Sequence, residues 1–172
     1  MIRHEGFTVI ELLLTITIMV VLTTVAVVAL NRTQANGRDE ERRSDVDVIS
    51  RSLEQFYNSN SSTGTYIGTS SATVANLANL IPNLGQDALH APDVSTTDPI
   101  SLLPATNANQ TITGVLPQPT TTTYVYQPLQ YDAATSSFVL CTDHVTAECR
   151  KFNLYYRLEK TNEIIMVTSK QQ

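Results

Sequence analysis

The sequence contains no lysine or arginine between Arg51 and Arg150. Acidic side chains are spread through the same stretch, and the chain of 172 residues carries a net charge of −5. Proteins that grip nucleic acids need clustered cations to neutralise the phosphates. We therefore expect a solvated, neutral to acidic surface in the middle of the chain, and no nucleic acid as its main partner.

Motifs of catalysis and metal binding are also missing. The chain has no Gly-rich phosphate loop, no HExxH sequence and no GxSxG sequence. Its histidines, His4, His90 and His144, are scattered. We expect that the protein is not an enzyme and that it holds no metal ion and no cofactor.

Cysteine is scarce, since Cys141 and Cys149 are the only two and form no CxxC pair. In an exported domain, two cysteines this close in sequence usually form one disulfide. Two buried free thiols are the alternative. The choice between them depends on whether this part of the chain is exported.

Polar residues are rare in one segment near the N-terminus. Residues 7–30 form a run of 24 in which only six are not hydrophobic. A helix of this length, at about 1.5 Å per residue, is about 36 Å long and crosses a hydrocarbon core of about 30 Å. A secretory signal has a much shorter apolar core, of about 7 to 15 residues. We expect one membrane-spanning helix followed by one modest soluble domain.

An acid, Glu11, lies inside this apolar run. A carboxylate in hydrocarbon costs about 2.5–3.5 kcal/mol, so it needs a partner or a role. Its place near the helix start, where the interface is wet and the helix dipole favours an anion, explains why it is tolerated. That explanation does not account for the residues around it.

Those residues match a known family. A short polar leader ends at Gly6, Phe7 follows it, Glu11 is the fifth residue after Gly6, and a long apolar helix continues. This junction resembles the prepilin leader junction of type IV pilins and type II secretion pseudopilins. The resemblance implies cleavage between Gly6 and Phe7, N-methylation of Phe7, and pairing of Glu11 with the terminal amine of a neighbouring subunit. Such a pair, away from water, compensates both charges and rejects wrong registers.

The resemblance also implies a location and partners. The protein would be a single-pass cytoplasmic membrane protein with its leader in the cytoplasm and its C-terminal head outside, surrounded by membrane lipid before assembly. It would then form an extracellular or periplasmic filament with copies of itself. A prepilin peptidase/methyltransferase and an inner-membrane assembly platform would be its other partners.

Three functions are compatible with this pattern. The first is a structural subunit of a type IV pilus-like filament. The second is a pseudopilin or minor pilin of a type II secretion or DNA-uptake system. The third is a membrane-tethered binding or catalytic domain that never polymerises, for which neither the Gly6–Phe7 junction nor Glu11 would be needed.

Two features depart from the family pattern. The leader carries Arg3 as its only firm cation, whereas four arginines follow the span: Arg32, Arg38, Arg42 and Arg43. Counting flanking cations would place the C-terminus inside, but acids at residues 39–41 are interspersed and the family exports its head. Many pilins also have a Pro or Gly in the membrane half of this helix, and residues 7–36 contain neither.

The helix is predicted to continue beyond the membrane, to about residue 58. Apolar residues recur at helical spacing on one face, at Val46, Ile49, Leu53 and Phe56. We therefore divide the chain into a leader, 1–6, a membrane or filament-core helix, 7–30, and an amphipathic half of the same helix, 31–58.

The remainder is predicted to be an irregular surface loop and a small sheet. Residues 59–123 have a loop composition with one short helix at 74–81, and residues 124–172 form an antiparallel sheet with a disulfide-bonded loop. Pro128 demotes part of the first strand to an edge. The predicted strands are 124–131, 137–142, 151–158 and 163–168.

The pairing of the predicted strands decides whether Cys141 and Cys149 lie close enough to form a disulfide. If the second and third strands pair antiparallel, Cys141 and Cys149 face each other with Cα atoms about 4.5–5.5 Å apart, within reach of a disulfide. The fold class expected is α+β, of the type IV pilin-like kind, with a long helix packed on a small antiparallel sheet.

Overall fold

The computed structural model describes residues 7–59, 64–70, 77–81, 84–95 and 97–170. The chain divides into two compact units, Met1–Gly37 and Arg38–Gln172, which we describe separately. Its elements, in chain order, are α1 (Val9–Ser59), α3 (Leu77–Leu80), η1 (Asp87–Leu89), β1 (Leu102–Pro104), β2 (Tyr124–Asp132), β3 (Ser137–Leu140), β4 (Lys151–Arg157) and β5 (Ile164–Thr168).

Helix α1 confirms the predicted long N-terminal helix, with bounds that differ from the prediction by one or two residues. In the first unit its side chains are exposed at every position from residue 7 to residue 34. Residues of this segment such as Phe7, at 82%, and Val9, at 77%, are among the most exposed apolar side chains described. An exposed apolar surface of this extent is typical of a membrane or protein interaction site.

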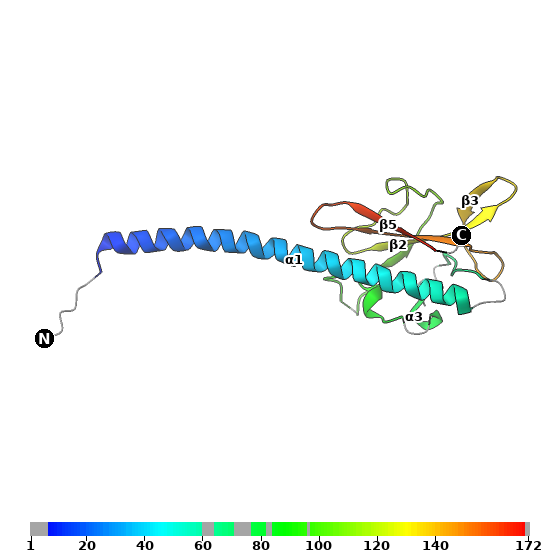
Figure 1. Ribbon diagram of the computed structural model, residues 1–172, viewed down its shortest axis with the longest axis horizontal. Coiled ribbons are helices and arrows are strands. Elements are labelled where there is room, and N and C mark those ends of the chain that lie inside the picture. The colour runs from blue at the N-terminus through cyan, green and yellow to red at the C-terminus, as the bar shows by residue number, and fades with distance from the viewer. Residues whose placement is uncertain (1–6, 60–63, 71–76, 82–83, 96, 171–172) are drawn as a thin grey trace. The chain divides into compact units, whose positions relative to one another are not determined.

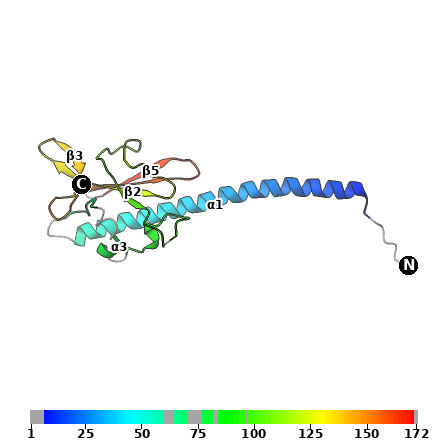
Figure 2. The same cartoon turned by 180° about the vertical axis from the view of Figure 1, so that it is seen from behind.

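In the second unit, the part of α1 from Arg38 onwards lies along one face of the sheet (Figures 1 and 2). Val46, Ile49 and Leu53 are at most 1% exposed and Phe56 packs against the same core, as the helical spacing predicts. They contact apolar side chains of the sheet in one cluster, including Tyr124, Tyr126, Phe152 and Leu154. The α+β class is therefore confirmed.

The sheet has five strands in the order β1-β2-β4-β5, with β3 paired to β2. Three pairings are antiparallel, but β1 runs parallel to β2, with Leu102 opposite Tyr124. The prediction of a purely antiparallel sheet is wrong, because β1 lies in a stretch that we expected to be irregular. A strand of three residues is too short to leave a recognisable alternation in the sequence.

Pro128 lies in the central strand, so its assignment to a sheet edge is also wrong. The Pro128 carbonyl accepts a hydrogen bond from Cys141 N, which follows β3, at 3.0 Å. The backbone N and O of one residue face the same edge of an antiparallel strand. The missing N–H of Pro128 therefore faces the Cys141 carbonyl, which accepts a hydrogen bond from Thr69 N instead, at 3.0 Å.

The described part of residues 59–123 contributes several side chains to the core, although we predicted a surface loop; most of its other residues are exposed or half-buried. Its apolar side chains fill the space beside α1 and the sheet: Leu84, Leu89, Ala91, Leu102 and Val115 are all under 7% exposed. Of the short helix predicted at 74–81, α3 covers Leu77–Leu80, and residues 74–76 lie outside the described residues.

Candidate functional site

The N-terminal end of α1 is closed by Thr8 and Glu11. Glu11 N donates to Thr8 Oγ1 at 3.3 Å, while Glu11 Oε2 accepts from Thr8 N at 3.2 Å and from Thr8 Oγ1 at 2.9 Å. This reciprocal arrangement is a capping box, in which Thr8 is the N-cap and Glu11 the third helical residue. The Thr-x-x-Glu spacing is visible in the sequence, and our sequence reasoning missed it.

Only one of the two carboxylate oxygens of Glu11 takes part in the capping box. Its bonds from Thr8 go to Oε2, and in the described part of the chain Oε1 has no hydrogen-bond partner. Phe7 lies directly before Thr8 in the chain. Gly6, the other predicted cleavage residue, lies outside the described residues.

Threonines inside the apolar run keep their hydroxyl groups satisfied within the helix. Thr15 donates to the Leu12 carbonyl at 2.8 Å, and Thr17 donates to the Leu13 carbonyl at 2.7 Å. Hydroxyl groups paired in this way are tolerated in hydrocarbon. Among the described helices, α1 is long and apolar enough to cross a membrane, so a single span is a candidate.

The predicted disulfide is present. Cys141 and Cys149 are bonded, with Cα atoms 5.5 Å apart, and both are fully buried. The strand pairing from which we predicted it is wrong, however. Both β3 and β4 pair with β2, where Leu129 has Leu140 on one side and Lys151 on the other. The disulfide therefore joins the two chain segments that flank β2.

A segment that we predicted to be a loop supports the disulfide. Tyr66 N donates to the Cys149 carbonyl at 2.8 Å, and Thr69 N donates to the Cys141 carbonyl at 3.0 Å. Gly68 lies between these contacts, and a Cβ atom there would be 2.5 Å from the Thr142 carbonyl oxygen. Only glycine allows so close an approach without movement of the backbone.

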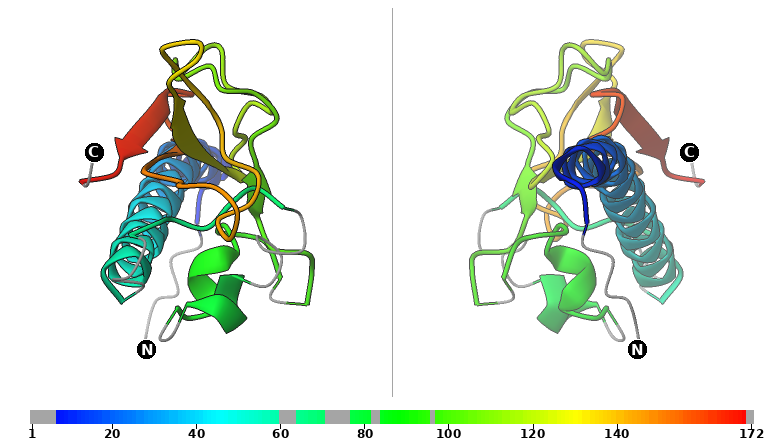
Figure 3. Two further views of the ribbon diagram at one scale, coloured as in Figure 1. Left: turned by 90° about the vertical axis from the view of Figure 1, so that its right-hand side faces the viewer. Right: turned by 90° about the vertical axis from the view of Figure 1, so that its left-hand side faces the viewer.

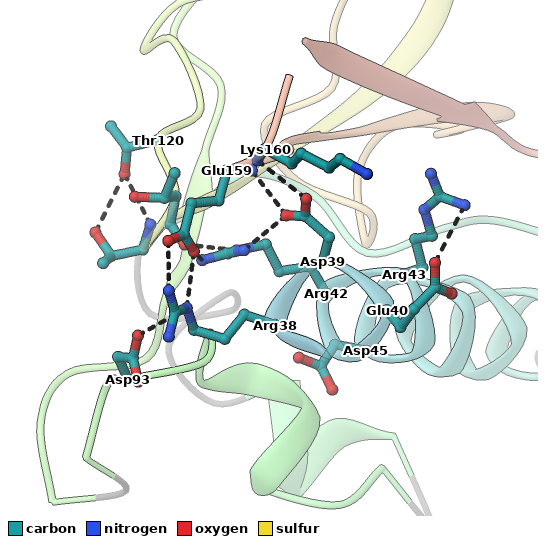
Figure 4. Close-up of polar contacts among 12 residues, drawn as sticks. Arg38, Asp39, Glu40, Arg42, Arg43, Asp45, Asp93, Thr120, Glu159 and Lys160 are labelled. Atoms are coloured by element: carbon teal, nitrogen blue, oxygen red, sulfur yellow. Dashed lines mark hydrogen bonds and ion pairs between the residues drawn. The ribbon is translucent and has the colours of Figure 1, made fainter. Parts of the chain in front are cut away.

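A cluster of charged side chains lies where the second unit begins (Figure 4). Arg42, whose side chain is 2% exposed, donates from Nη1 to Asp39 Oδ1 at 2.9 Å and from Nη2 to Glu159 Oε2 at 3.3 Å. Its Nε donates to the Thr121 carbonyl at 2.8 Å. Arg38 donates from Nε to Glu159 Oε2 at 2.8 Å and from Nη2 to Glu159 Oε1 at 2.5 Å.

Asp39 completes this cluster by accepting two backbone bonds. Glu159 N and Lys160 N donate to its two carboxylate oxygens at 2.7 and 3.1 Å. The turn between β4 and β5 is thus fixed to α1. Hydrogen bonds from Arg38 lower the pKa of Glu159 to about 2. Sequence reasoning had treated these arginines only as charges flanking a membrane span.

A second polar contact joins α1 to β2. The Tyr124 hydroxyl donates to Asp45 Oδ2 at 2.8 Å. Burial raises the pKa of Asp45 to about 6, although the bond from Tyr124 opposes the rise. Burial also raises the pKa of Tyr124 above its ordinary value. This pair lies within the packed interface between helix and sheet, so we assign it to packing.

Within the described residues, no group of three or more His, Cys, Asp or Glu side chains is placed to hold a metal ion. His90 lies with its ring nitrogens 2.9 Å from the Gln86 carbonyl and 3.2 Å from the Asp98 carbonyl, so it fixes a loop. Of the predicted site residues that the structure describes, Phe7 and Glu11 lie outside the packed core and are exposed, whereas Cys141 and Cys149 lie inside it.

Comparison with known proteins adds no relative to this description. No family model, no curated protein and no solved structure matches the chain.

Proposed function

We propose that this chain is a type IV pilin-like prepilin. It is cleaved between Gly6 and Phe7, is anchored by residues 7–30, and polymerises through this segment into an extracytoplasmic filament. The observation that carries the proposal is an uncovered apolar helix with an acid, Glu11, in its first turn. A pseudopilin or minor pilin of a secretion or DNA-uptake system is the alternative within the same family, and it shares the same processing and pairing.

The apolar helix alone is equally suited to a simple membrane tether. Glu11 bears on the choice, because a tether has no use for its charge beyond the cap that it gives the helix. Cleavage before Phe7 would create an ammonium group one helical turn from Glu11. In a bundle of such helices, the oxygen Oε1, which the capping box leaves unused, is available to the amine of a neighbouring subunit. A charge-assisted bond of this kind sets the register of otherwise uniform apolar helices.

The capping box offers a competing explanation for Glu11, and three substitutions separate the two. Glu11→Gln keeps the box, since Gln also serves at this position, but removes the charge. Thr8→Ala removes the cap, at a cost of about 0.5–2 kcal/mol, and keeps the charge. Glu11→Ala removes both.

If Glu11 pairs with an amine, both Glu11 variants lose filaments and Thr8→Ala keeps most of them. Electron microscopy of filaments sheared from cells measures this yield, with the amount of full-length and cleaved chain in membranes as the control. Normal filaments from Glu11→Gln together with few from Thr8→Ala would show that the acid serves only as a cap. A wild-type chain that is cleaved but never polymerises would favour the tethered domain.

Processing has its own test. Mass spectrometry of the assembled protein is expected to find a mature chain that begins with a methylated Phe7. Gly6→Val places a bulky side chain beside the scissile bond and is expected to accumulate the precursor. Retention of Met1 in filaments would refute cleavage at this site.

A further inference from the structure

The loop that joins β1 to β2 lies over the face of the sheet that is turned away from α1 (Figure 3). Val115 of this loop packs against Val125 of β2, whereas α1 packs against Tyr124 on the other face. Gln127, a fully buried residue of β2, donates from Nε2 to the Asn109 carbonyl at 3.0 Å. The loop is therefore a fixed part of the surface of the second unit.

This loop carries the tripeptide Asn109-Gln110-Thr111. The pattern Asn-x-Ser/Thr, in which x is not proline, is the acceptor sequence for N-linked glycans, and it is used on surface loops of exported proteins. Two further tripeptides of this kind begin at Asn31 and Asn60. Because so short a pattern often occurs by chance, the geometry of each one has to decide whether it is an acceptor.

Asn109 and Thr111 present their side chains together, and both residues are exposed. Asn109 Oδ1 accepts hydrogen bonds from Thr111 Oγ1 at 2.9 Å and from Thr111 N at 3.1 Å, which is an Asx turn. We find no hydrogen bond from Asn109 Nδ2 among the described residues. The amide lies against Gly114, whose lack of a side chain leaves room for it. The amide and the hydroxyl that define an acceptor thus lie side by side at the surface.

The tripeptide that begins at Asn31 has the opposite geometry. It lies within α1, and side chains two residues apart on a helix do not face each other. Thr33 Oγ1 donates to the Ala29 carbonyl, at 3.0 Å, instead of to Asn31. Asn60 lies outside the described residues. Of the two tripeptides that the structure describes, the one in the loop has the geometry of an acceptor.

We infer that Asn109 carries an N-linked glycan, which an oligosaccharyltransferase transfers from a lipid-linked oligosaccharide pyrophosphate. Asn109 Nδ2 forms a bond to the anomeric carbon of the first sugar, while the bond from that carbon to the pyrophosphate oxygen breaks. The lipid pyrophosphate leaves with the electron pair, and Nδ2 loses one proton to a base of the transferase. The inference rests on the exported head of the proposed function, because this transfer takes place outside the cytoplasm.

Mass spectrometry of the full-length protein from its native cells tests the inference. Trypsin has no site between Arg51 and Arg150, so a protease that cuts before aspartate is used. It releases residues 98–131, in which Asn109 begins the only Asn-x-Ser/Thr tripeptide. This peptide is expected to carry the mass of an oligosaccharide, and electron-transfer fragmentation is expected to place that mass on Asn109.

Substitutions at the loop and at α1 identify the acceptor. Asn109→Gln is expected to remove the added mass from the intact chain, while the matched control, Asn31→Gln, keeps it. Thr111→Ser retains the hydroxyl and is expected to keep the glycan, whereas Thr111→Val removes the hydroxyl and is expected to lose it. Near-UV circular dichroism of the tyrosines checks that each variant is folded.

Two outcomes would overturn the inference: an unmodified Asn109 in the wild-type protein, or a glycan on threonines of the same peptide with none on Asn109. Val145 is 82% exposed, so labelling of Val145→Cys in intact cells with a membrane-impermeant thiol reagent reports export separately. A labelled head with an unmodified Asn109 would leave the proposed function standing. A glycosylated chain that is never cleaved and never polymerises would leave this inference standing and refute the proposed function.

Discussion

The buried charge cluster at the start of the second unit gives the sharpest test of what fixes α1 to the sheet. Arg42→Ala removes the guanidinium that faces Asp39, whose side chain is 9% exposed. Leaving a buried charge without its partner costs about 3–5 kcal/mol. Asp39 keeps its two backbone N–H donors, so we expect the low end of this range, about 3 kcal/mol. For a unit of this size that corresponds to a loss of about 10 °C in Tm.

The neighbouring arginine is a matched control. Arg43 pairs with Glu40 at 3.6 Å, but both side chains are more than half exposed. Exposed pairs contribute about 0–1 kcal/mol, so Arg43→Ala is expected to change the free energy of unfolding little. All seven tyrosines follow residue 56, so near-UV circular dichroism of the full chain in detergent reports unfolding of the second unit alone.

A double-substitution cycle then isolates the pair. Removing both Asp39 and Arg42 leaves neither charge buried alone, so the double variant should lose less stability than the sum of the single ones. Additive losses, or an Arg42→Ala loss no larger than that of Arg43→Ala, would refute the view that this pair fixes the helix.

The remaining predictions concern acid stability, the disulfide and Gly68. Because the pKa of Glu159 is lowered from 4.5 to about 2, its ionised form stabilises the fold above about pH 4.5, and this contribution is lost as the pH falls towards 2; Glu159→Gln should flatten that part of a stability–pH curve. Cys141→Ala/Cys149→Ala should cost about 2.6 kcal/mol from loop entropy; alkylation of two thiols in the unreduced wild type would contradict the bond itself. Gly68→Ala should cost about 1–3 kcal/mol in unfolding experiments, because the Thr142 backbone must move. Gly85→Ala, with no described atom within 4 Å, is its control, and equal losses would refute the close-approach argument.

The elements with a regular pattern were predictable. The apolar face of α1 repeats over several turns at Val46, Ile49 and Leu53, and the alternation in β4 continues for seven residues. A pattern of this length specifies the element. In α1 it also specifies the buried face, whereas in β4 Asn153 and Tyr155 on the opposite face are buried as well. The bounds of β2, β4 and β5 accordingly differ from the prediction by one residue.

The pairing of strands was less predictable, because it depends on contacts far apart in sequence. Nothing local to Cys141 or Cys149 indicates that β2 passes between their strands. The short strand β1 is positioned by its pairing with β2, in which Leu103 lies opposite Val125. A loop composition rich in Thr, Asn and Pro likewise does not reveal that Leu89 and Val115 are buried.

The arginines around residue 40 have two explanations: they set the orientation of a membrane span, or they form ion pairs in the folded second unit. The structure weakens the first explanation. The arginines after the apolar run had favoured a cytoplasmic C-terminus by the rule for flanking cations. Arg38 and Arg42 bind Glu159 and Asp39 in the folded second unit. Folding alone therefore accounts for two of these cations, which weakens them as a signal of orientation.

An exported head thus remains our prediction, and the flanking-cation rule, which is the main argument against it, now rests on fewer arginines. The cations left unexplained by buried contacts are Arg32, which is exposed, and Arg43, which pairs on the surface with Glu40. A flank of two such arginines with adjacent acids is a modest barrier to translocation. Labelling of Val145→Cys in intact cells with a membrane-impermeant thiol reagent measures the orientation directly: an exported head is labelled before lysis, and a head that reacts only after lysis would restore the cation rule.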